Sequence, residues 1–143
     1  MIVSRYHDIS AAHRIVDHPG KCRFIHGHNY RIHFHIEGEI TGLGMVVDFA
    51  IIKASLCEWL DTMWDHKLLL WDADPLLVDL DALLTKHQTI GNIVAVPFNT
   101  TAENMAQYLL DVVGPMVLTE GVALKKVVIE ETAKCSVVAE NTP

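Results

Sequence analysis

Residues 29–39, Asn-Tyr-Arg-Ile-His-Phe-His-Ile-Glu-Gly-Glu, contain the clearest period-two pattern in the chain. Apolar side chains occupy every second position, and polar side chains stand between them; the apolar set is Tyr30, Ile32, Phe34 and Ile36. Because successive side chains of a strand point to opposite faces, the pattern predicts a strand over 29–39 with one buried face. We expect His33 and His35 to lie on its polar face, in structural or interface roles.

The segments around this strand supply the other elements of a small domain. Hydrophobic spacing and turn residues predict an extended segment over 2–13, helices over 49–63, 75–86 and 102–117, and strands over 89–97 and 124–132. This order favours an α+β domain, with two helices on one face of a mainly antiparallel four-stranded sheet. We expect Asp48 to cap the first helix, and Thr100 to open the helix at 102–117 as a capping box with Glu103.

Each of the two long helices is expected to bury one apolar stripe, because its hydrophobic residues recur three or four positions apart. In the first helix the stripe is Phe49, Ile52, Leu56, Trp59, Leu60 and Met63. In the second helix it is Met105, Ala106, Leu109, Val113 and Met116. Cys57 stands beside the first stripe and is interpreted as a small buried hydrophobe.

The chain has 143 residues, a length that predicts one domain spanning 1–143. Its net charge of −7 gives no electrostatic footprint for binding nucleic acid or anionic membranes. No apolar stretch approaches the roughly 18 residues of a membrane span. The three cysteines have no framework spacing and the N-terminal residues lack a signal-peptide pattern, so we expect a cytoplasmic protein.

Histidines are concentrated in one part of the chain, since six of the nine fall between His13 and His35. In His26-Gly27-His28, two imidazoles two residues apart on an extended backbone point to the same side. With His13 from the preceding strand they give the three-ligand pattern of a catalytic zinc with an open position. The alternative is that these histidines only form hydrogen bonds to neighbours on a sheet face.

Cys22 lies four residues before His26, between the cations Lys21 and Arg23. Neighbouring positive charge favours the thiolate form of a cysteine. Three interpretations stay open from spacing alone: the fourth ligand of a closed Cys-His₃ structural site, a general base beside an open zinc, or an inert loop cysteine.

Two further places carry acidic or basic groups suited to catalysis or binding. Asp65-His66 is an adjacent pair in which a carboxylate can orient an imidazole as a proton relay, although such pairs also occur by chance at helix ends. Glu131 shares a strand face with Val127 and Ile129, where a carboxylate needs a partner. An ordinary salt bridge is the alternative there.

Six segments together resemble the family of 6-pyruvoyltetrahydropterin and 6-carboxytetrahydropterin synthases over nearly the whole chain. They are Ser10-Ala-Ala-His13, Cys22-x-x-x-His26-Gly-His28-Asn-Tyr30, Gly44-Met-Val-Val-Asp48-Phe49, Asp65-His66-Lys67-Leu68-Leu69-Leu70, Pro97-Phe-Asn-Thr-Thr-Ala-Glu103-Asn104 and Glu131-Thr132. The resemblance implies that His13, His26 and His28 hold Zn²⁺. It also implies a catalytic set of Cys22, Asp65 and His66, a pterin-anchoring Glu131, and a pterin pocket lined near Thr101 and Glu103. One departure is Thr100, where the family often has proline.

The resemblance also implies a fold, an assembly and a reaction. The fold is the tunnelling fold, in which three subunits close their sheets into a barrel, two such rings can stack, and active sites lie between subunits. The three-residue gap between Cys22 and His26 looks like the bacterial 6-carboxy branch, which converts 7,8-dihydroneopterin triphosphate to 6-carboxy-5,6,7,8-tetrahydropterin for 7-deazapurine synthesis. The alternatives are a 6-pyruvoyl synthase on the same substrate and a non-catalytic, zinc-stabilised ring protein that binds a pterin or purine. Lys21, Arg23 and Lys67 are candidates for holding the triphosphate.

Overall fold

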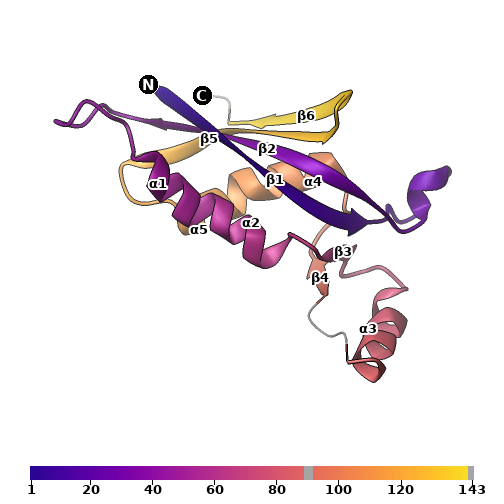
Figure 1. Cartoon of the computed structure of the whole chain (residues 1–143). Helices are drawn as coiled ribbons and strands as arrows, with labels where there is room; N and C mark the ends of the chain where they lie inside the picture. The colour runs from indigo at the N-terminus through magenta and orange to yellow at the C-terminus, as the bar shows by residue number, and fades with distance from the viewer. Residues whose placement is uncertain (89–91, 142–143) are drawn as a thin grey trace.

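The computed structural model describes residues 1–88 and 92–141, which form a six-stranded sheet against two long helical segments (Figure 1). The strands are β1 (Ile2–His13), β2 (His26–Gly38), β3 (Leu68–Trp71), β4 (Ile93–Val96), β5 (Val122–Thr132) and β6 (Cys135–Glu140). Their order across the sheet is β4-β3-β1-β2-β5-β6. The α+β class is confirmed, whereas the expectation of four strands is wrong.

The two additional strands, β3 and β6, carry weak sequence signals. β3 is four apolar residues without alternation, and it runs parallel to both β1 and β4. β6 is an edge strand that pairs only with β5 in the part of the chain that the structure describes. β4 is shorter than the strand expected over 89–97, and residues 89–91 of that prediction lie outside the described residues.

The register between the two longest strands decides which side chains share a face. β1 and β2 pair antiparallel along their full length, from Ile2 opposite Glu37 to His13 opposite His26. β5 continues this face on the other side of β2, with Ile129 opposite Ile32. The odd positions of β1 and the even positions of β2 therefore lie together on the face that forms the core.

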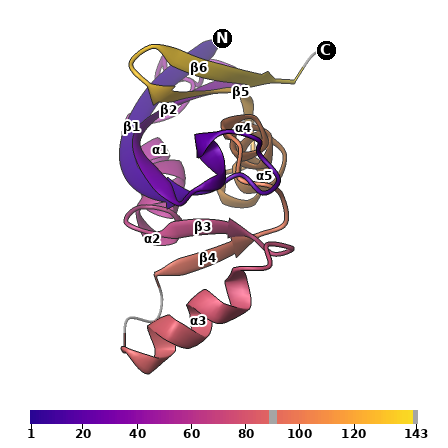
Figure 2. The same ribbon diagram turned by 90° about the vertical axis from the view of Figure 1, so that its right-hand side faces the viewer.

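Both long helical segments follow the predicted spans and cover the same face of the curled sheet (Figure 2). The first consists of α1 (Phe49–Ile52), a π-helical turn η2 (Lys53–Cys57) and α2 (Glu58–Met63). The second consists of α4 (Ala102–Tyr108), a π-helical turn η3 (Leu109–Val113) and α5 (Gly114–Val117). Two helices on one face of the sheet are thus confirmed.

The helix caps agree with the sequence at one helix and differ at the other. Asp48 accepts a hydrogen bond from the Ala50 amide at 2.8 Å, as expected. At α4, the N-cap is Thr101, whose hydroxyl accepts from the Asn104 amide at 3.2 Å. The expected capping role of Thr100 is therefore wrong, because its side chain is buried and bonded elsewhere.

The buried stripes are confirmed in their centres and wrong at their ends. Ile52, Leu56 and Leu60 are buried in the first segment, and Met105, Ala106, Leu109 and Val113 in the second. Phe49, Met63 and Met116 are exposed, because each lies within one residue of a segment end, where the helix leaves the sheet. Trp64, just beyond α2, fills the core in place of Met63, and Cys57 is buried as expected.

The short helix α3 (Leu77–Lys86) matches the helix expected over 75–86 and projects beyond β4, away from the main body (Figures 1 and 2). None of its residues is fully buried. Across the described residues, we find no helix with the length and apolar character needed to span a membrane.

Candidate metal centre

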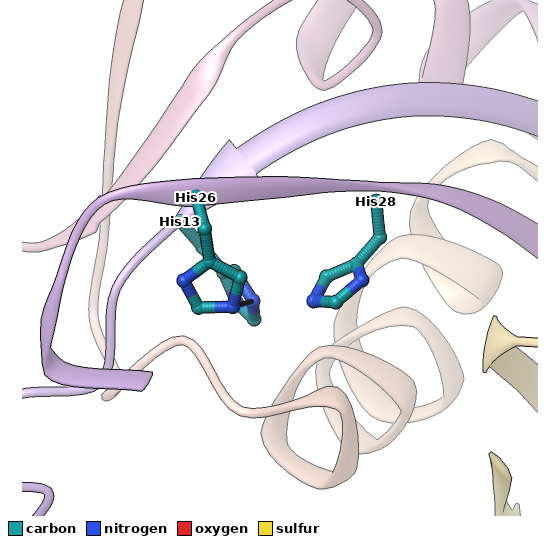
Figure 3. Close-up of side chains that lie close together, drawn as sticks. All are labelled: His13, His26 and His28. Carbon is teal, nitrogen blue, oxygen red and sulfur yellow. Dashed lines mark hydrogen bonds between the residues drawn. The ribbon is translucent and has the colours of Figure 1, made fainter. Parts of the chain in front are cut away.

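Three histidines converge where β1 ends and β2 begins. His13 is the last residue of β1 and pairs with His26, the first residue of β2, while His28 lies two residues along the same face. Figure 3 shows the rings of His26 and His28 projecting from one side of β2, with His13 beside His26. One ligand nitrogen of each ring lies within 4.8 Å of the other two. The structure therefore brings together the three residues that the sequence singles out as metal ligands.

Hydrogen bonds at the outer ring nitrogens leave the inner ones available to a cation. His13 Nδ1 donates to the Thr100 carbonyl at 2.6 Å, and His26 Nδ1 donates to the Phe24 carbonyl at 2.7 Å. Because a carbonyl only accepts, each neutral ring carries its hydrogen on Nδ1 and a lone pair on Nε2. These two Nε2 atoms lie 3.2 Å apart, and His28 Nε2 is buried with no hydrogen-bond partner among the described residues. Lone pairs this close repel unless a proton or cation lies between them, so the donor set fits a metal ion.

Burial favours the metal-binding form of two of the imidazoles, those of His13 and His28. The pKa of His13 is lowered to about 4, mainly by desolvation and also by the nearby His26 and His28, against the opposing effect of the bond to the Thr100 carbonyl. Desolvation also lowers the pKa of His28, which Glu131 partly offsets. Neutral imidazole is the metal-binding form, so no proton has to be displaced from His13 near pH 7.

Two other side chains lie at the cluster. The Tyr30 hydroxyl is 3.3 Å from His13 Nε2, and burial raises the pKa of Tyr30, so it stays a neutral donor. A Glu131 oxygen lies 3.8 Å from His28 Nε2. The neighbouring Glu130 contacts His33 at 3.0 Å on the opposite face. Glu131 therefore shares the histidine face, as its strand position indicates, and sequence reasoning missed the position of the Tyr30 hydroxyl.

Cys22 lies in the loop between β1 and β2, within a 3₁₀ turn η1 (Lys21–Arg23). Its side chain is half-buried, and its carbonyl accepts from the Ile15 amide at 2.8 Å. Among the described residues, the cluster of close ligand atoms contains the three histidines and not Cys22. This arrangement favours an open three-histidine site over a closed Cys-His₃ site.

The Asp65–His66 pair is ordered by the outer edge of β1. Asp65 accepts from His66 Nδ1 and from the Ser10 amide, both at 2.8 Å, and the His66 amide donates to the Ser10 carbonyl at 2.7 Å. Burial alone would raise the pKa of Asp65, but the bonds from Ser10 and His66 outweigh it and lower that pKa. His66 has φ of 58° and a side chain that is 82% exposed.

His66 is not brought into the histidine cluster of its own chain. It lines a cavity of about 570 Å³ on the polar side of the sheet, together with Asp65, Arg31 and Glu130. It also lines a cavity of about 450 Å³ that reaches His28, with β1 between the two histidines. The expected catalytic set is therefore split within one chain, with Asp65 and His66 on one side of β1 and the metal cluster at its end.

The remaining expected residues lie on segments next to the site. Thr101 and Glu103 open α4, directly after the Thr100 carbonyl that holds His13. Lys67 lines the cavity of about 450 Å³ with His66. The Arg23 guanidinium donates to the carbonyls of residues 19 and 20 and lies over a neighbouring aromatic ring, so it is bound to its own loop.

Comparison with known sequences and solved structures agrees with this fold. A sequence model described as "6-pyruvoyl tetrahydropterin synthase" matches residues 2–142. The chain belongs to this family. A relative from Rickettsia typhi, named 6-carboxy-5,6,7,8-tetrahydropterin synthase, is 33% identical over 132 residues, covering 91% of this chain and 93% of its own. A relative of the same name from Haemophilus influenzae is 30% identical over 115 residues, covering 76% and 79%.

Solved structures have the same fold over nearly the whole length of this chain. An uncharacterized protein from Wolinella succinogenes superposes with a TM-score of 0.86 at 21% identity, covering 99% of this chain and 98% of the other. The 6-pyruvoyl tetrahydropterin synthase from Caenorhabditis elegans superposes with a TM-score of 0.69 at 28% identity, covering 99% and 96%. The fold of this chain is thus one that solved structures already contain.

Proposed function

We propose that this chain is a zinc-dependent 6-carboxy-5,6,7,8-tetrahydropterin synthase. In this reaction 7,8-dihydroneopterin triphosphate and water are converted to 6-carboxytetrahydropterin, with release of acetaldehyde and triphosphate. The observation that carries the proposal is the cluster of three imidazoles, with two Nε2 atoms 3.2 Å apart and the third without a partner among the described residues. The names of the relatives supply the class of product, a 6-carboxytetrahydropterin, and the family resemblance implies the substrate.

The roles proposed for the chain's residues are those that the family resemblance implies for them. Zn²⁺ held by the three histidines would supply Lewis acidity to the hydroxyl groups of the substrate side chain. Cys22, as thiolate, takes a proton from that side chain, and His66, oriented by Asp65, moves protons to and from the reacting carbons. Glu131 accepts from the pterin ring N–H and amino group and so fixes the ring.

The pterin pocket and the triphosphate site are proposed on the same basis. Thr101 and Glu103 line the pterin pocket at the start of α4, next to the turn that holds His13. Lys67 and Lys21 are the candidate triphosphate ligands, while Arg23 organises the Cys22 loop. The product would feed the synthesis of 7-deazapurines such as the queuosine precursor.

The assembly proposed for the chain is a trimer, or a dimer of trimers, whose sheets close into a barrel. β3 pairs with β1 only at Ala12 and His13, so within the described chain the outer edge of residues 2–9 has no strand beside it. β6 leaves a second free edge at the other end of the sheet. Pairing these edges between copies removes both and brings the Asp65–His66 pair of one subunit toward a neighbour.

Mass spectrometry of the product made from 7,8-dihydroneopterin triphosphate by the zinc-loaded protein tests the activity. We expect 6-carboxytetrahydropterin and one equivalent of acetaldehyde. A 6-pyruvoyl product would instead assign the chain to the other branch of the family. Tight pterin binding without any product would indicate a non-catalytic ring protein.

A further inference from the structure

Arg14, the residue after His13, contacts three separate loops around the metal centre. Its Nε and Nη2 donate to both carboxylate oxygens of Asp74, at 2.6 and 2.8 Å. Its Nη1 donates to the Arg23 carbonyl at 3.1 Å, and its own carbonyl accepts from the Thr100 hydroxyl at 2.8 Å. One residue thus connects the β3–α3 loop, the Cys22 loop and the turn before α4.

The Arg14–Asp74 pair is built to hold one geometry. The Asp74 side chain is fully buried, that of Arg14 is 15% exposed, and Asp74 Oδ1 also accepts from the Leu76 amide at 2.9 Å. Two parallel hydrogen bonds fix the plane of a guanidinium as well as its position. Because Asp74 holds two of its nitrogens, the third is directed at the loop that carries Cys22.

The Cys22 loop is attached to the end of β1 at two consecutive carbonyls. The Ile15 amide donates to the Cys22 carbonyl at 2.8 Å, and Arg14 donates to the Arg23 carbonyl. The Arg23 side chain closes the loop on itself through two further carbonyls. The loop is also held by the bond from His26 to the Phe24 carbonyl and by two bonds between Val16 and Asn99. A loop that is closed internally moves as a unit, so its position relative to His13 depends on these attachments, and Arg14 supplies the one made by a charged side chain.

We propose that Arg14 is a positioning residue: together with Asp74 it fixes the Cys22 loop relative to His13, and so sets the placement of the thiol beside the metal centre. The importance of that placement for turnover rests on the proposed function, while the attachment of the loop rests on the contacts above. A displacement of about 1 Å in a catalytic group can lower a rate by roughly 10²-fold.

The attachment is tested by the rate at which iodoacetamide alkylates Cys22, followed for each cysteine-containing peptide by mass spectrometry. Arg14→Lys keeps a cation beside Asp74 but replaces the planar fork by a single ammonium group. We expect the alkylation rate of Cys22 to rise roughly tenfold or more. Loss of a hydrogen bond from a charged donor makes local opening of the loop more frequent by about that factor. The buried Cys57 should stay protected. An unchanged Cys22 rate, or a parallel rise at Cys57, overturns the proposal.

Two further variants keep this test decisive. If Arg14→Lys does not fold, the same criterion applies to the double variant Arg14→Met/Asp74→Leu, which leaves no buried charge unpaired. The control is Arg31→Lys, because Arg31 also forms two hydrogen bonds to one carboxylate, that of Asp8, at 2.8 and 3.0 Å, in an exposed pair on the polar face of the sheet. A rise in Cys22 alkylation as large in Arg31→Lys as in Arg14→Lys overturns the proposal.

Kinetic measurements test the positioning role of Arg14 separately from the proposed function. With 7,8-dihydroneopterin triphosphate, Arg14→Lys should lower kcat by roughly tenfold to a hundredfold at nearly unchanged KM and zinc content. A readily alkylated Cys22 with unchanged kcat overturns the positioning role. Wild-type protein without turnover overturns the proposed function instead, and the alkylation rates then decide whether Arg14 holds the loop.

Discussion

His13 is the histidine whose titration depends most on its surroundings, and this predicts a pH dependence of folding. Burial lowers its pKa from 6.5 to about 4, so below pH 6.5 the unfolded chain binds a proton that the folded chain excludes. The stabilisation is complete above pH 6.5 and is lost as the pH falls toward about 4, by at most about 3 kcal/mol. The free energy of unfolding of metal-free protein, measured in urea at several pH values between 4 and 7, should change less steeply with pH for His13→Asn than for wild type. Identical slopes would contradict the assignment.

Metal binding should depend on the ligands of β2 individually. His26→Ala or His28→Ala should each remove about one equivalent of zinc and abolish turnover, because two nitrogens seldom hold a catalytic zinc tightly. The measurement is metal content by elemental analysis after gel filtration. His35→Ala is the matched control, since it removes an imidazole from the polar face of the same strand. Full zinc retention in both His26→Ala and His28→Ala would contradict the assignment of the metal site.

Cys22 should behave as a base and not as a ligand. Cys22→Ala should keep zinc, while turnover falls by roughly 10²-fold or more. Cobalt-substituted wild type without substrate should lack a strong thiolate-to-metal charge-transfer band. Loss of metal in the variant together with such a band in wild type would instead indicate a closed structural site.

At the residue scale, the sequence predicts the ligands better than their surroundings. Two histidines two positions apart on a strand must share a face, so local spacing was enough to select His26 and His28. The partner of His13 is the Thr100 carbonyl, 87 residues away, and a backbone carbonyl leaves no mark in the residue types. The ion pair between Arg14 and Asp74 is likewise long-range, since the two residues are 60 positions apart in the chain.

At the element scale, Gly114 shows how one helix is matched to the sheet. A Cβ at this position would lie 2.8 Å from two side-chain carbons of Leu124 on β5. Gly114→Ala should therefore destabilise the protein by about 1–3 kcal/mol, although alanine is the better helix former. Gly42→Ala, where nothing lies within 4 Å, should change the free energy of unfolding by less than about 0.5 kcal/mol. Urea unfolding at one protein concentration checks both, and equal effects would contradict the packing argument.

The elements themselves were predictable where one periodicity runs long enough. Both long helical spans follow from their apolar stripes, but the π-helical turns at η2 and η3 do not, since these insertions depend on packing against the sheet. β3 has four residues and runs parallel, so neither alternation nor a hairpin turn announces it. β2 begins at His26, three residues earlier than its alternation indicates, because pairing with β1 extends it.

At the scale of the whole molecule, the split catalytic set predicts an active site shared between subunits. Cys22 lies in the loop beside the metal cluster, whereas His66 lies beyond the outer edge of β1. In the proposed barrel that edge meets the β6 edge of a neighbour, so the two residues of one site come from different chains. Cys22→Ala and His66→Ala proteins, each inactive alone, should regain part of the wild-type activity when unfolded and refolded together.

The control for this mixing experiment is the oligomer itself. A mass tag on one variant shows whether mixed oligomers form, and each variant refolded alone sets the background activity. The double variant Cys22→Ala/His66→Ala, mixed with either single variant, should restore no activity, because one of the two residues is then missing from every chain. Mixed oligomers without recovered activity would mean that Cys22 and His66 act within one chain.

The strand order has a consequence for the nascent chain during its synthesis on the ribosome. β2 lies between β1 and β5, yet roughly 80 residues of synthesis separate the end of β2 at Gly38 from the start of β5 at Val122. At about 5–20 residues per second, the β1–β2 hairpin waits roughly 4–17 s before β5 is synthesised. During that interval the alternating segment that ends in Phe34 and Ile36 has an unpaired backbone edge and uncovered apolar side chains. We expect nascent chains arrested in this window to be the form of the protein that chaperones bind.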